Sequence, residues 1–388
     1  MTRIDDQLAF LVEADKLKSV IRGTTLCDGS RHENTGEHSW HIALYALVMA
    51  EHAVKPVNVD RVIKMLLLHD LVEIDAGDHP IGEKVDWQAV AIAEKAAATR
   101  LFGLLPGDQG AALHGLWLEF EQAESPDARF AKHLDHCQPI FQTLYGSAPL
   151  PDHIDVVRGN LHGGRAAALE QNFPQAYHHA LSLLGKTTTQ DVSPLTRRLP
   201  FLNEADALKT VLRATWIGDG SRAENSAEHS WHIMLYGWIL GEYAATDIDI
   251  SRVINMLLLH DIVEVDAGDT PIHGAVSAQA QAAQEAEEQQ AADRLFGLLP
   301  APQATEFRVL WDEFEAAASA DAVYAKAIDR VQPVLLNLLN GGGSWLEYDV
   351  SLQQVESRVG VKVSRGAPEV WTYVRDRISP WFEENERL

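Results

Sequence analysis

The sequence predicts an all-α protein made of two tandem helical bundles related by internal duplication. Two observations lead to this prediction. The 388-residue chain matches itself at a fixed offset, which is the sign of a duplicated folding unit. Apolar residues also recur at the helical period in both copies, whereas the alternation typical of strands is nearly absent. At roughly 100–200 residues per domain, the length favours two or three domains, and two is the starting count.

The duplication is read directly from shared sequence. Asp28–Asp78 aligns without a gap with Asp219–Asp269, and 31 of the 51 aligned residues are identical. The offset is 191 residues here and 194 residues from Leu101 and Leu295 onward, so the second copy carries a three-residue insertion. We expect this insertion near the Ala-, Gln- and Glu-rich stretch 278–292, which is typical of a solvated helix.

Three helices are predicted in the first copy, each with a counterpart in the second. Residues 39–53 and 59–72 carry apolar side chains at helical spacing, and the second of these helices ends near an Asp-Ala-Gly-Asp turn. A third helix is expected over 127–145. The stretch 186–194 is polar and ends in proline, as linkers do. We therefore place the two domains at 1–190 and 198–388.

Composition excludes several classes of function. A formal charge of −24 repels nucleic-acid phosphates and anionic lipids, so neither a nucleic-acid polymer nor a membrane is an expected partner. A small phosphorylated ligand remains compatible with this charge if a cation lies in the site. The chain has two cysteines without a CxxC pair, no signal-peptide pattern and no apolar run long enough to span a bilayer. These features predict a cytoplasmic protein.

Each copy carries histidine and aspartate residues suited to a metal ion. A His-Asp dyad follows three leucines, and burying these two side chains is costly unless a partner pairs with them. The alternative is that they bond each other or the backbone. The dyad recurs in both copies with an upstream Glu-His and a downstream Asp, which favours one divalent metal per copy. The predicted ligands are His38, His69, Asp70 and Asp135 in the first copy and His229, His260, Asp261 and Asp329 in the second.

Two further carboxylates follow each dyad. Glu73 comes four residues after His69 and would share its helical face, close enough to act on bound water; the alternative is a solvated carboxylate. Asp78 ends the same segment and either faces the site or caps a turn. Their counterparts in the second copy are Glu264 and Asp269. We predict that these four residues are catalytic.

Arginines ahead of the first metal histidine are candidates to bind an anionic substrate. Arg31 lies in the segment Ser-Arg-x-Glu-Asn, where a guanidinium would meet a phosphate, with an ion pair to Glu33 as the alternative. In the second copy, Arg222 has the same choice with Glu224. Further candidates of this kind are Arg22 and Arg213.

Three motifs closely resemble those of the HD-domain metal-dependent phosphohydrolases, and within them the bacterial 5′-deoxynucleotidase-like branch. They are Arg-x-Glu-Asn-x-x-Glu-His-Ser-Trp-His, Leu-Leu-His-Asp-x-Val-Glu-x-Asp-Ala-Gly-Asp and Ile-Asp-Arg-Val-Gln-Pro. The resemblance covers residues 200–385 and about the first 145 residues. It implies five or more helices around one divalent metal per domain (Mn, Co, Mg, Fe or Zn) held by the residues above. It also implies proton transfer by Glu73 or Glu264, a water oriented by Asp78 or Asp269, and an arginine on the phosphate.

The resemblance implies hydrolysis of nucleoside 5′-monophosphates, in particular deoxyribonucleotides, by metal-activated water. The alternatives are a nucleoside triphosphate hydrolase of the same superfamily, a di-iron oxygenase, or a catalytically silent nucleotide-binding module. The oxygenase needs extra histidines that the two copies do not share. Members of the branch form homodimers, so two copies in one chain resemble a covalent pseudo-dimer. His136 stands where the second copy has Arg330, and this favours the second copy if only one is active.

Overall fold

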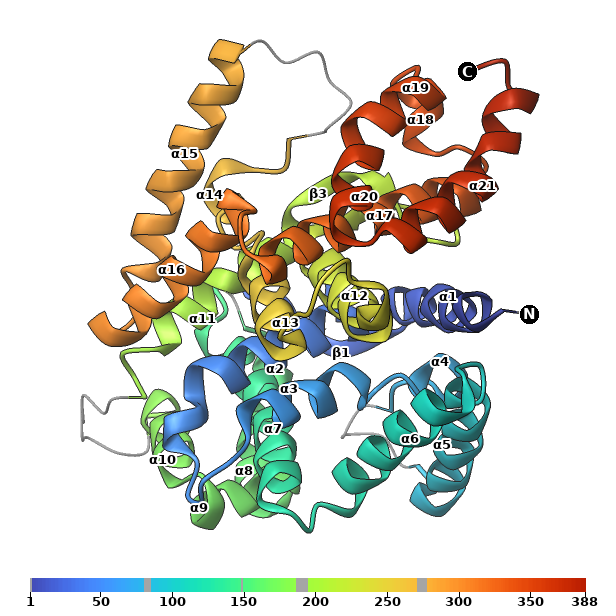
Figure 1. Cartoon of the computed structure of the whole chain (residues 1–388). Helices are drawn as coiled ribbons and strands as arrows, with labels where there is room; N and C mark the ends of the chain where they lie inside the picture. Colours follow the sequence, from blue (N-terminus) through green and yellow to red (C-terminus); the bar gives the residue numbers. More distant parts are fainter. Residues whose placement is uncertain (1, 80–84, 148, 186–194, 271–277) are drawn as a thin grey trace. The chain divides into compact units, whose positions relative to one another are not determined.

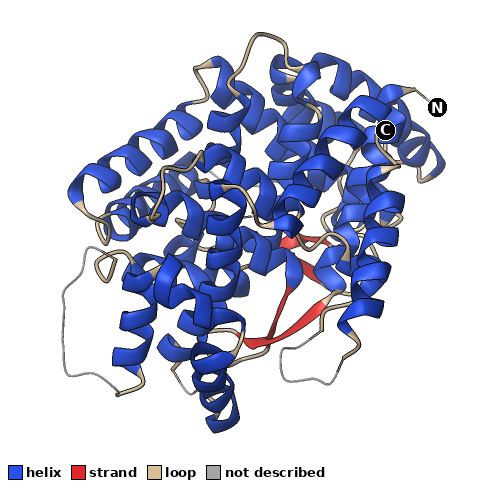
Figure 2. Ribbon diagram, turned by 90° about the horizontal axis from the view of Figure 1, so that it is seen from below, coloured by secondary structure: helices blue, strands red, loops and turns tan. Residues whose placement is uncertain are grey.

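The computed structural model describes residues 2–79, 85–147, 149–185, 195–270 and 278–388. The described chain is helical apart from two antiparallel hairpins, which are drawn in red in Figure 2. The predicted all-α fold is therefore confirmed. The chain divides into two compact units, the first formed by residues 1–207 and 297–303 and the second by residues 208–296 and 304–388. No described helix is long and apolar enough to cross a membrane.

The first unit consists of a bundle of helices and one two-stranded hairpin (Figure 1). Strand β1 (Ile21–Thr25) pairs with β2 (His32–Asn34), with Ile21 opposite Asn34. The helices are α1 (Arg3–Ala14), α2 (Thr35–Met49), α3 (Val59–Leu68), α4 (Glu73–Ala76), α5 (Trp87–Phe102), α6 (Gly107–Gln122), α7 (Pro126–Tyr145), α8 (Pro151–Gly163), α9 (Leu169–Asn172), α10 (Pro174–Leu183) and α11 (Leu199–Ala205).

The second unit repeats this order. Strands β3 (Leu212–Trp216) and β4 (Ala223–Asn225) form its hairpin. The helices are α12 (Ser226–Ile239), α13 (Ile250–Leu259), α14 (Glu264–Ala267), α15 (Ala278–Phe296), α16 (Ala301–Ala316, whose first three residues belong to the first unit), α17 (Ala320–Leu339), α18 (Ser344–Glu347), α19 (Leu352–Val355), a π-helical turn over Glu356–Gly360, α20 (Val361–Gly366) and α21 (Pro368–Glu384).

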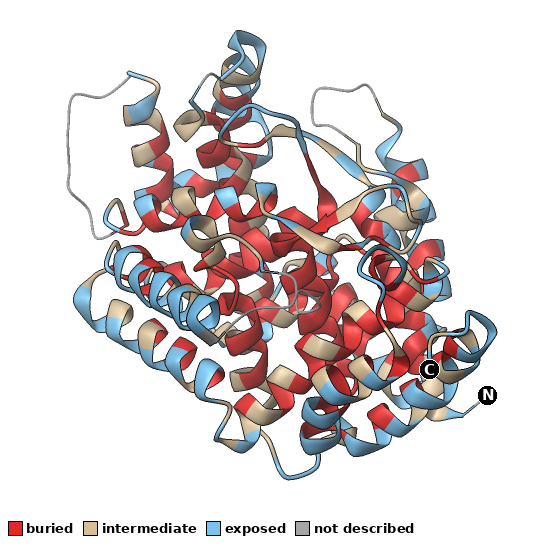
Figure 3. Ribbon diagram, turned by 90° about the horizontal axis from the view of Figure 1, so that it is seen from above, coloured by how far each residue is buried: buried red, intermediate tan, exposed pale blue. Residues whose placement is uncertain are grey.

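The core of each unit lies where the helix that follows the hairpin packs against two others, α3 and α7 for α2 in the first unit and α13 and α17 for α12 in the second. Nearly every residue of α2 is buried. In Figure 3 the buried residues, drawn in red, gather on the inner helices, while exposed residues lie on the outer ones. The start of α2 is fixed by a capping box in which Asn34 and Glu37 satisfy each other's backbone N–H groups. Asn225 and Glu228 do the same for α12. These caps set the direction from which the following histidine enters the core.

The predicted helix over 59–72 is wrong at its C-terminal end. Helix α3 ends at Leu68, and the chain then tightens into turns in which Leu71 N–H donates to Leu68 and Glu73 N–H donates to Asp70. Glu73 therefore begins the separate short helix α4 rather than extending the helix of His69. Sequence periodicity missed this break because both sides of it are apolar or helix-compatible.

The other expectations for local structure fare better. Helix α7 matches the predicted 127–145 within one residue, whereas the helix predicted over 39–53 begins at Thr35 and ends at Met49. Helix α15 has 19 described residues against 16 in α5, which agrees with the three-residue insertion. The linker predicted over 186–194 lies outside the described residues.

The boundary between the compact units lies beyond the predicted linker. Helix α11 and Asp206 belong to the second copy by sequence offset, yet they are part of the first unit. Asp206 accepts a hydrogen bond from the Cys27 backbone at 2.7 Å. The first unit is thus completed by residues of the second sequence copy. The domain ranges 1–190 and 198–388 remain a prediction about the duplicated segments.

Candidate metal and active site

The predicted metal ligands of the first unit converge from three helices. His38 lies in the first turns of α2, His69 and Asp70 directly follow α3, and Asp135 lies within α7. One ligand atom each of His38, His69 and Asp135 can be chosen so that all three lie within 4.8 Å of one another. The His38 Nε2 atom is 3.1 Å from Asp135 Oδ1, and His69 Nε2 is 2.9 Å from Asp70 Oδ2. The four residues therefore share one small volume, although Asp70 is turned toward an arginine.

The hydrogen bonds of His69 favour a cation at this point. Its Nδ1 lies 2.8 Å from the carbonyl oxygen of Leu66, which can only accept, so Nδ1 carries the proton. The remaining Nε2 is buried, has no hydrogen-bond partner among the described residues, and faces the carboxylates of Asp70 and Asp135. A lone pair that faces carboxylate oxygens is unfavourable unless a proton or a cation lies between them. Two imidazoles and two carboxylates form a donor set that suits a divalent transition metal.

The second unit repeats this geometry closely. His229 Nε2 lies 3.2 Å from Asp329 Oδ1, and His260 Nε2 lies 2.9 Å from Asp261 Oδ1. His260 Nδ1 is 2.8 Å from the Leu257 carbonyl oxygen, and its buried Nε2 again lacks a hydrogen bond within the described residues. The same unsatisfied nitrogen thus recurs in both copies at the predicted metal position. The alternative considered from the sequence, a hydrogen bond from the dyad to the backbone, is also present, because Nδ1 of each histidine bonds a carbonyl oxygen.

Glutamines contact the first candidate metal histidine of each unit. Gln138 Oε1 lies 3.0 Å from His38 Nδ1, and the amide nitrogen of Gln138 lies 3.2 Å from His41 Nδ1 and 3.3 Å from Glu33 Oε1. His41 Nε2 in turn donates to the carbonyl oxygen of Leu202 on α11 at 2.9 Å. His41 thus acts on the site through Gln138, and α11 anchors this chain of hydrogen bonds.

Sequence reasoning assigned no role to these glutamines. The only available signal was that Gln138 and Gln332 recur three residues after the metal aspartate, in the quoted motif Asp-Arg-Val-Gln-Pro of the second copy. Gln332 makes the equivalent contacts, with Oε1 3.1 Å from His229 Nδ1 and Nε2 2.7 Å from Glu224 Oε1. Buried tryptophans add support from behind: Trp117 and Trp311 donate to the carbonyl oxygens of His69 and His260, each at 3.1 Å.

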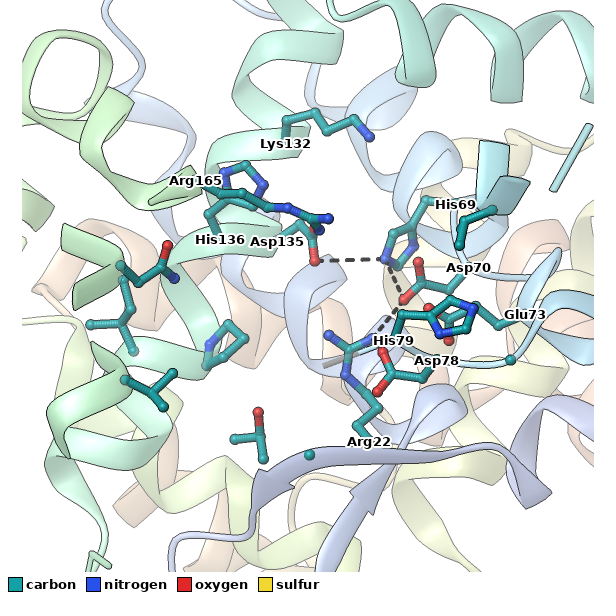
Figure 4. Close-up of a pocket in the computed structure, with 18 of the residues that line it drawn as sticks. Arg22, His69, Asp70, Glu73, Asp78, His79, Lys132, Asp135, His136 and Arg165 are labelled. Carbon is teal, nitrogen blue, oxygen red and sulfur yellow. Dashed lines mark hydrogen bonds and ion pairs between the residues drawn. The ribbon is translucent and has the colours of Figure 1, made fainter. Parts of the chain in front are cut away.

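Arg22 and Arg213 are the predicted arginines that reach the sites. Arg22 on β1 lies 2.8 Å from Asp70 Oδ2 and 3.9 Å from Asp78 Oδ1, and Figure 4 shows it pointing up from the strand toward both. Burial lowers the pKa of Arg22, but Asp70 and the other carboxylates outweigh burial and raise it overall. Arg213 lies 2.7 Å from Asp261 and 3.8 Å from Asp269. Each guanidinium thus bridges a predicted ligand and a predicted catalytic carboxylate.

Arg31 and Arg222 lie elsewhere. Arg31 forms a two-pronged ion pair with Glu37, at 3.0 and 2.5 Å, and Arg222 pairs with Glu228 at 2.7 and 2.9 Å. Neither arginine is among the residues that line the pockets beside the metal sites. The sequence alternative named Glu33 and Glu224 as ion-pair partners, whereas these ion pairs are made with the capping-box glutamates of α2 and α12. These arginines therefore help to fix the start of α2 and α12.

The predicted catalytic carboxylates surround the same points. Glu73 Oε2 accepts a hydrogen bond from Thr35 Oγ1 at 3.0 Å, and Glu264 Oε2 accepts one from Ser226 Oγ at 2.5 Å. Burial first, and then the neighbouring aspartate of the dyad, raises the pKa of both glutamates well above 4.5. Burial also raises the pKa of Asp78. Asp269 is shifted upward for the same reason, so its pKa is likewise above 3.8. A shift in this direction favours the protonated, neutral form of each carboxyl group.

A cavity opens beside each set of residues. In the first unit it has a volume of about 560 Å³, large enough for a small organic ligand. Figure 4 shows Asp70, Glu73 and Asp78 on one side of it, and Asp135, His136 and Arg165 across the gap. In the second unit the cavity measures about 900 Å³ and contains Asp261, Glu264, Asp269 and Asp329. Each candidate site is therefore a pocket with a metal-ligand cluster in its wall.

Helices that carry paired histidines and aspartates around a pocket define a class of helical metal-binding proteins, and comparison with known proteins gives the family. The family model described as HD domain matches residues 14–177 and 205–371, which together are most of the chain. The chain belongs to the HD domain family, and carries that domain twice.

The chain is also similar to individual proteins of known name. 5′-Deoxynucleotidase HDDC2 of Bos taurus is 33% identical over 136 residues, which make up 35% of this chain and 65% of that protein. The Homo sapiens protein of the same name is 32% identical over 136 residues, with the same coverage. A solved structure of a predicted metal-dependent phosphohydrolase from Magnetospirillum magnetotacticum MS-1 is 42% identical. It has a TM-score of 0.48 and covers 51% of this chain and 98% of that one. The chain thus spans about two thirds of the first two relatives.

Proposed function

We propose that the protein is a divalent-metal-dependent phosphohydrolase that removes phosphate from nucleoside 5′-monophosphates, in particular deoxyribonucleotides. The observation that carries this proposal is the unsatisfied Nε2 of His69 and His260, which faces carboxylates inside a pocket in both units. The names of the deoxynucleotidase relatives support the choice of substrate.

In this proposal one metal ion, of Mn, Co, Mg, Fe or Zn, is held in each unit. The residues that would hold it are His38, His69, Asp70 and Asp135 in the first unit and His229, His260, Asp261 and Asp329 in the second. A divalent metal bound there lowers the pKa of a water ligand and offsets charge on phosphoryl oxygens.

The chain's own residues then position the substrate and move protons. Arg22 and Arg213 offer the phosphate a guanidinium beside the dyad aspartate. Glu73 and Glu264, whose pKa values are raised, take a proton from the attacking water, and Asp78 and Asp269 accept a hydrogen bond from that water. The oxygen of water forms a new bond to phosphorus while the bond from phosphorus to the 5′ oxygen breaks. The products are inorganic phosphate and a nucleoside, whose 5′ oxygen takes up a proton.

The test is phosphate release from deoxyribo- and ribonucleoside mono- and triphosphates with Mn²⁺, Co²⁺, Mg²⁺ or no added metal. The full chain is compared with Asp70→Ala, Asp261→Ala and the double variant. Asp75→Ala is the matched control, because Asp75 lies in the same segment but pairs with Arg100 at 2.6 Å outside the pocket. Release that needs metal and survives Asp75→Ala but not the double variant supports the proposal. Metal bound at both sites without release from any nucleotide would refute it.

Two further statements remain predictions beside this function. The sequence predicts that the two copies form a pseudo-dimer within one chain, and that the protein works in the cytoplasm. The first is tested by the radius of gyration of the protein in solution, which is smaller for two packed copies than for two independent ones, and the second by localisation of the native protein in its source cells.

A further inference from the structure

The pocket of the second unit is lined by both carboxylates and cations. The carboxylates of Asp261, Glu264 and Asp269 surround the Arg213 guanidinium, and Glu285, Glu288 and Glu315 also line the pocket. The cations come from α17, the π-helical turn and α20, and they are Lys326, Arg330, Arg358, Lys362 and Arg365. One metal ion and one phosphate beside the candidate ligands would leave the cations of α20 available to a further anionic group.

The spacing of these cations places them in two facing rows. Lys326 and Arg330 are four residues apart on α17 and share a face of that helix. Arg358, Lys362 and Arg365 follow one another at intervals of four and three residues along a continuous helical segment, so they too share a face. Figure 1 shows α20 running beside α17.

A glycine allows the two rows to come this close. A Cβ atom at Gly366, the last residue of α20, would lie 2.5 Å from the carbonyl oxygen of Val323 and 2.7 Å from Ala327 Cβ on α17. No side chain fits there without moving one helix away from the other. The close approach of the two backbones is therefore built into the sequence, and it brings the cations of α20 to the wall of the same cavity as those of α17.

The carboxylates of the unit do not neutralise all of these cations. Lys326 pairs with Glu315 at 2.8 Å, and Arg330 Nε lies 3.4 Å from Asp329. Lys362 and Arg365 have no ion-pair partner within the described part of the chain, and both are exposed. The pKa of Lys362 lies below its usual 10.5. The largest cause is the charge of Arg330, followed by burial and the charge of Lys326, as expected for an ammonium group beside like charges.

The first unit lacks this arrangement. Lys132 corresponds to Lys326 and pairs with Glu121 at 2.7 Å, but His136 replaces Arg330. In place of the cationic helix, α8 contributes His153, Val156, Val157 and Asn160 to the pocket. Arg165 also lines this pocket, and its guanidinium carbon lies 4.4 Å from the ring centre of Trp87.

We propose that the pocket of the second unit binds nucleotides that carry a second phosphate group, which contacts Lys362 and Arg365 while the scissile phosphate lies beside the candidate metal ligands. This inference rests on the proposed phosphohydrolase function and gives the second unit a substrate class that the first does not favour. Water adds to the scissile phosphorus, the bond to the rest of the nucleotide breaks, and the leaving oxygen takes a proton. The products are inorganic phosphate and a nucleotide with one phosphate fewer.

The test isolates the second site with Asp70→Ala and compares kcat/KM for three substrates: a deoxynucleoside 5′-monophosphate, the 5′-diphosphate and the 3′,5′-bisphosphate. The latter two distinguish where the second phosphate must be attached. We expect at least one of them to exceed the monophosphate by about tenfold or more. The Lys362→Ala/Arg365→Ala variant should lower that ratio by about tenfold, chiefly through KM, since hydrogen bonds to charged groups are of this strength. The control is Arg375→Ala, because Arg375 pairs with Glu356 at 2.6 Å outside the pocket.

A binding measurement separates this inference from the proposed function. Titration calorimetry of the same nucleotides into chelator-treated protein reports on the cations without turnover. Tighter binding of a doubly phosphorylated nucleotide, lost in the Lys362→Ala/Arg365→Ala variant, supports the inference even if no nucleotide is hydrolysed. Equal binding of all three nucleotides, or a preference that survives the double substitution, overturns it even if monophosphates are hydrolysed.

Discussion

Replacing Gln332 with methionine should weaken metal binding in the second unit without unfolding it. Gln332 is fully buried, and its Oε1 accepts the hydrogen of His229 Nδ1 at 3.1 Å. This bond keeps the proton on Nδ1 and leaves Nε2 of His229 free to face Asp329 and the metal position. Methionine has a similar volume but no acceptor or donor of comparable strength, so the packing is retained while the orienting bond is lost.

The size of the effect follows from the bonds removed. The substitution removes the bond to His229, the 2.7 Å bond from Gln332 Nε2 to the buried Glu224 carboxylate, and the 3.3 Å contact of Nε2 with His232 Nδ1. Loss of a group that orients a metal ligand typically costs about 10–100-fold in metal affinity, or about 1.4–2.7 kcal/mol. The two shorter of these bonds, at about 1 kcal/mol each, lead to a similar value.

The assay is calorimetric titration of Mn²⁺ into chelator-stripped protein that carries Asp70→Ala, so that only the second site titrates. The control is Gln353→Met, since Gln353 is exposed on α19. The mirror experiment uses Gln138→Met with Asp261→Ala, where Gln138 lies 3.0 Å from His38. Unchanged Mn²⁺ affinity in both glutamine variants, with the helical content retained, would show that these glutamines do not orient the metal histidines.

Three further predictions concern stability. Gly366→Ala should destabilise the second unit by about 1–3 kcal/mol because the new Cβ would overlap α17. Gly115 has open space around it, so Gly115→Ala should be neutral or stabilising by up to about 1 kcal/mol. Hydrogen exchange of peptides from α17 and α6 distinguishes the two outcomes. Trp311→Phe removes the bond to the His260 carbonyl oxygen and should lower protection of α13 by about 1 kcal/mol in the same experiment, and equal protection would contradict this. The pKa of His52 is lowered below 6.5, chiefly by burial and then by the charge of Arg198. The unfolded chain therefore binds this proton more tightly, and the first unit loses stability as pH falls below 6.5. His52→Gln should show a smaller fall in Tm between about pH 7.5 and about pH 5.5, and a fall equal to that of the wild type would refute the assignment.

Much of the fold was predictable because its signals are local or repeated. Helical periodicity predicted α7 within one residue, and the duplicated segments predicted two similar bundles. The same reasoning failed at Leu68, where α3 ends and turns lead to Glu73. An apolar pattern continues across that break, and only the hydrogen bonds of the folded chain show that the backbone tightens there.

The candidate site was predictable in its residue types but not in its contacts. Repetition of the His-Asp dyad pointed to His69 and His260, because a costly buried pair that is kept twice requires a partner. From the sequence, Arg31 and Arg222 were the stronger candidates to bind phosphate, and Arg22 and Arg213 the weaker ones. The fold places Arg22 beside Asp70 and turns Arg31 to Glu37, since the hairpin directs the two side chains to different neighbours.

By itself the sequence determined the all-α class, the duplication and the chemical identity of the candidate ligands, because these depend on spacing along one chain. Only the tertiary structure decided which distant groups meet. It brought Gln138 to His38, closed the first unit with α11 from the second sequence copy, and assembled the cations of α17 and α20 in one pocket. The physical reason is that side-chain contacts between separate helices depend on how closely the backbones pack. At Gly366 the two helices can approach closely because glycine has no Cβ atom. The helical period of the sequence gives no sign of this effect.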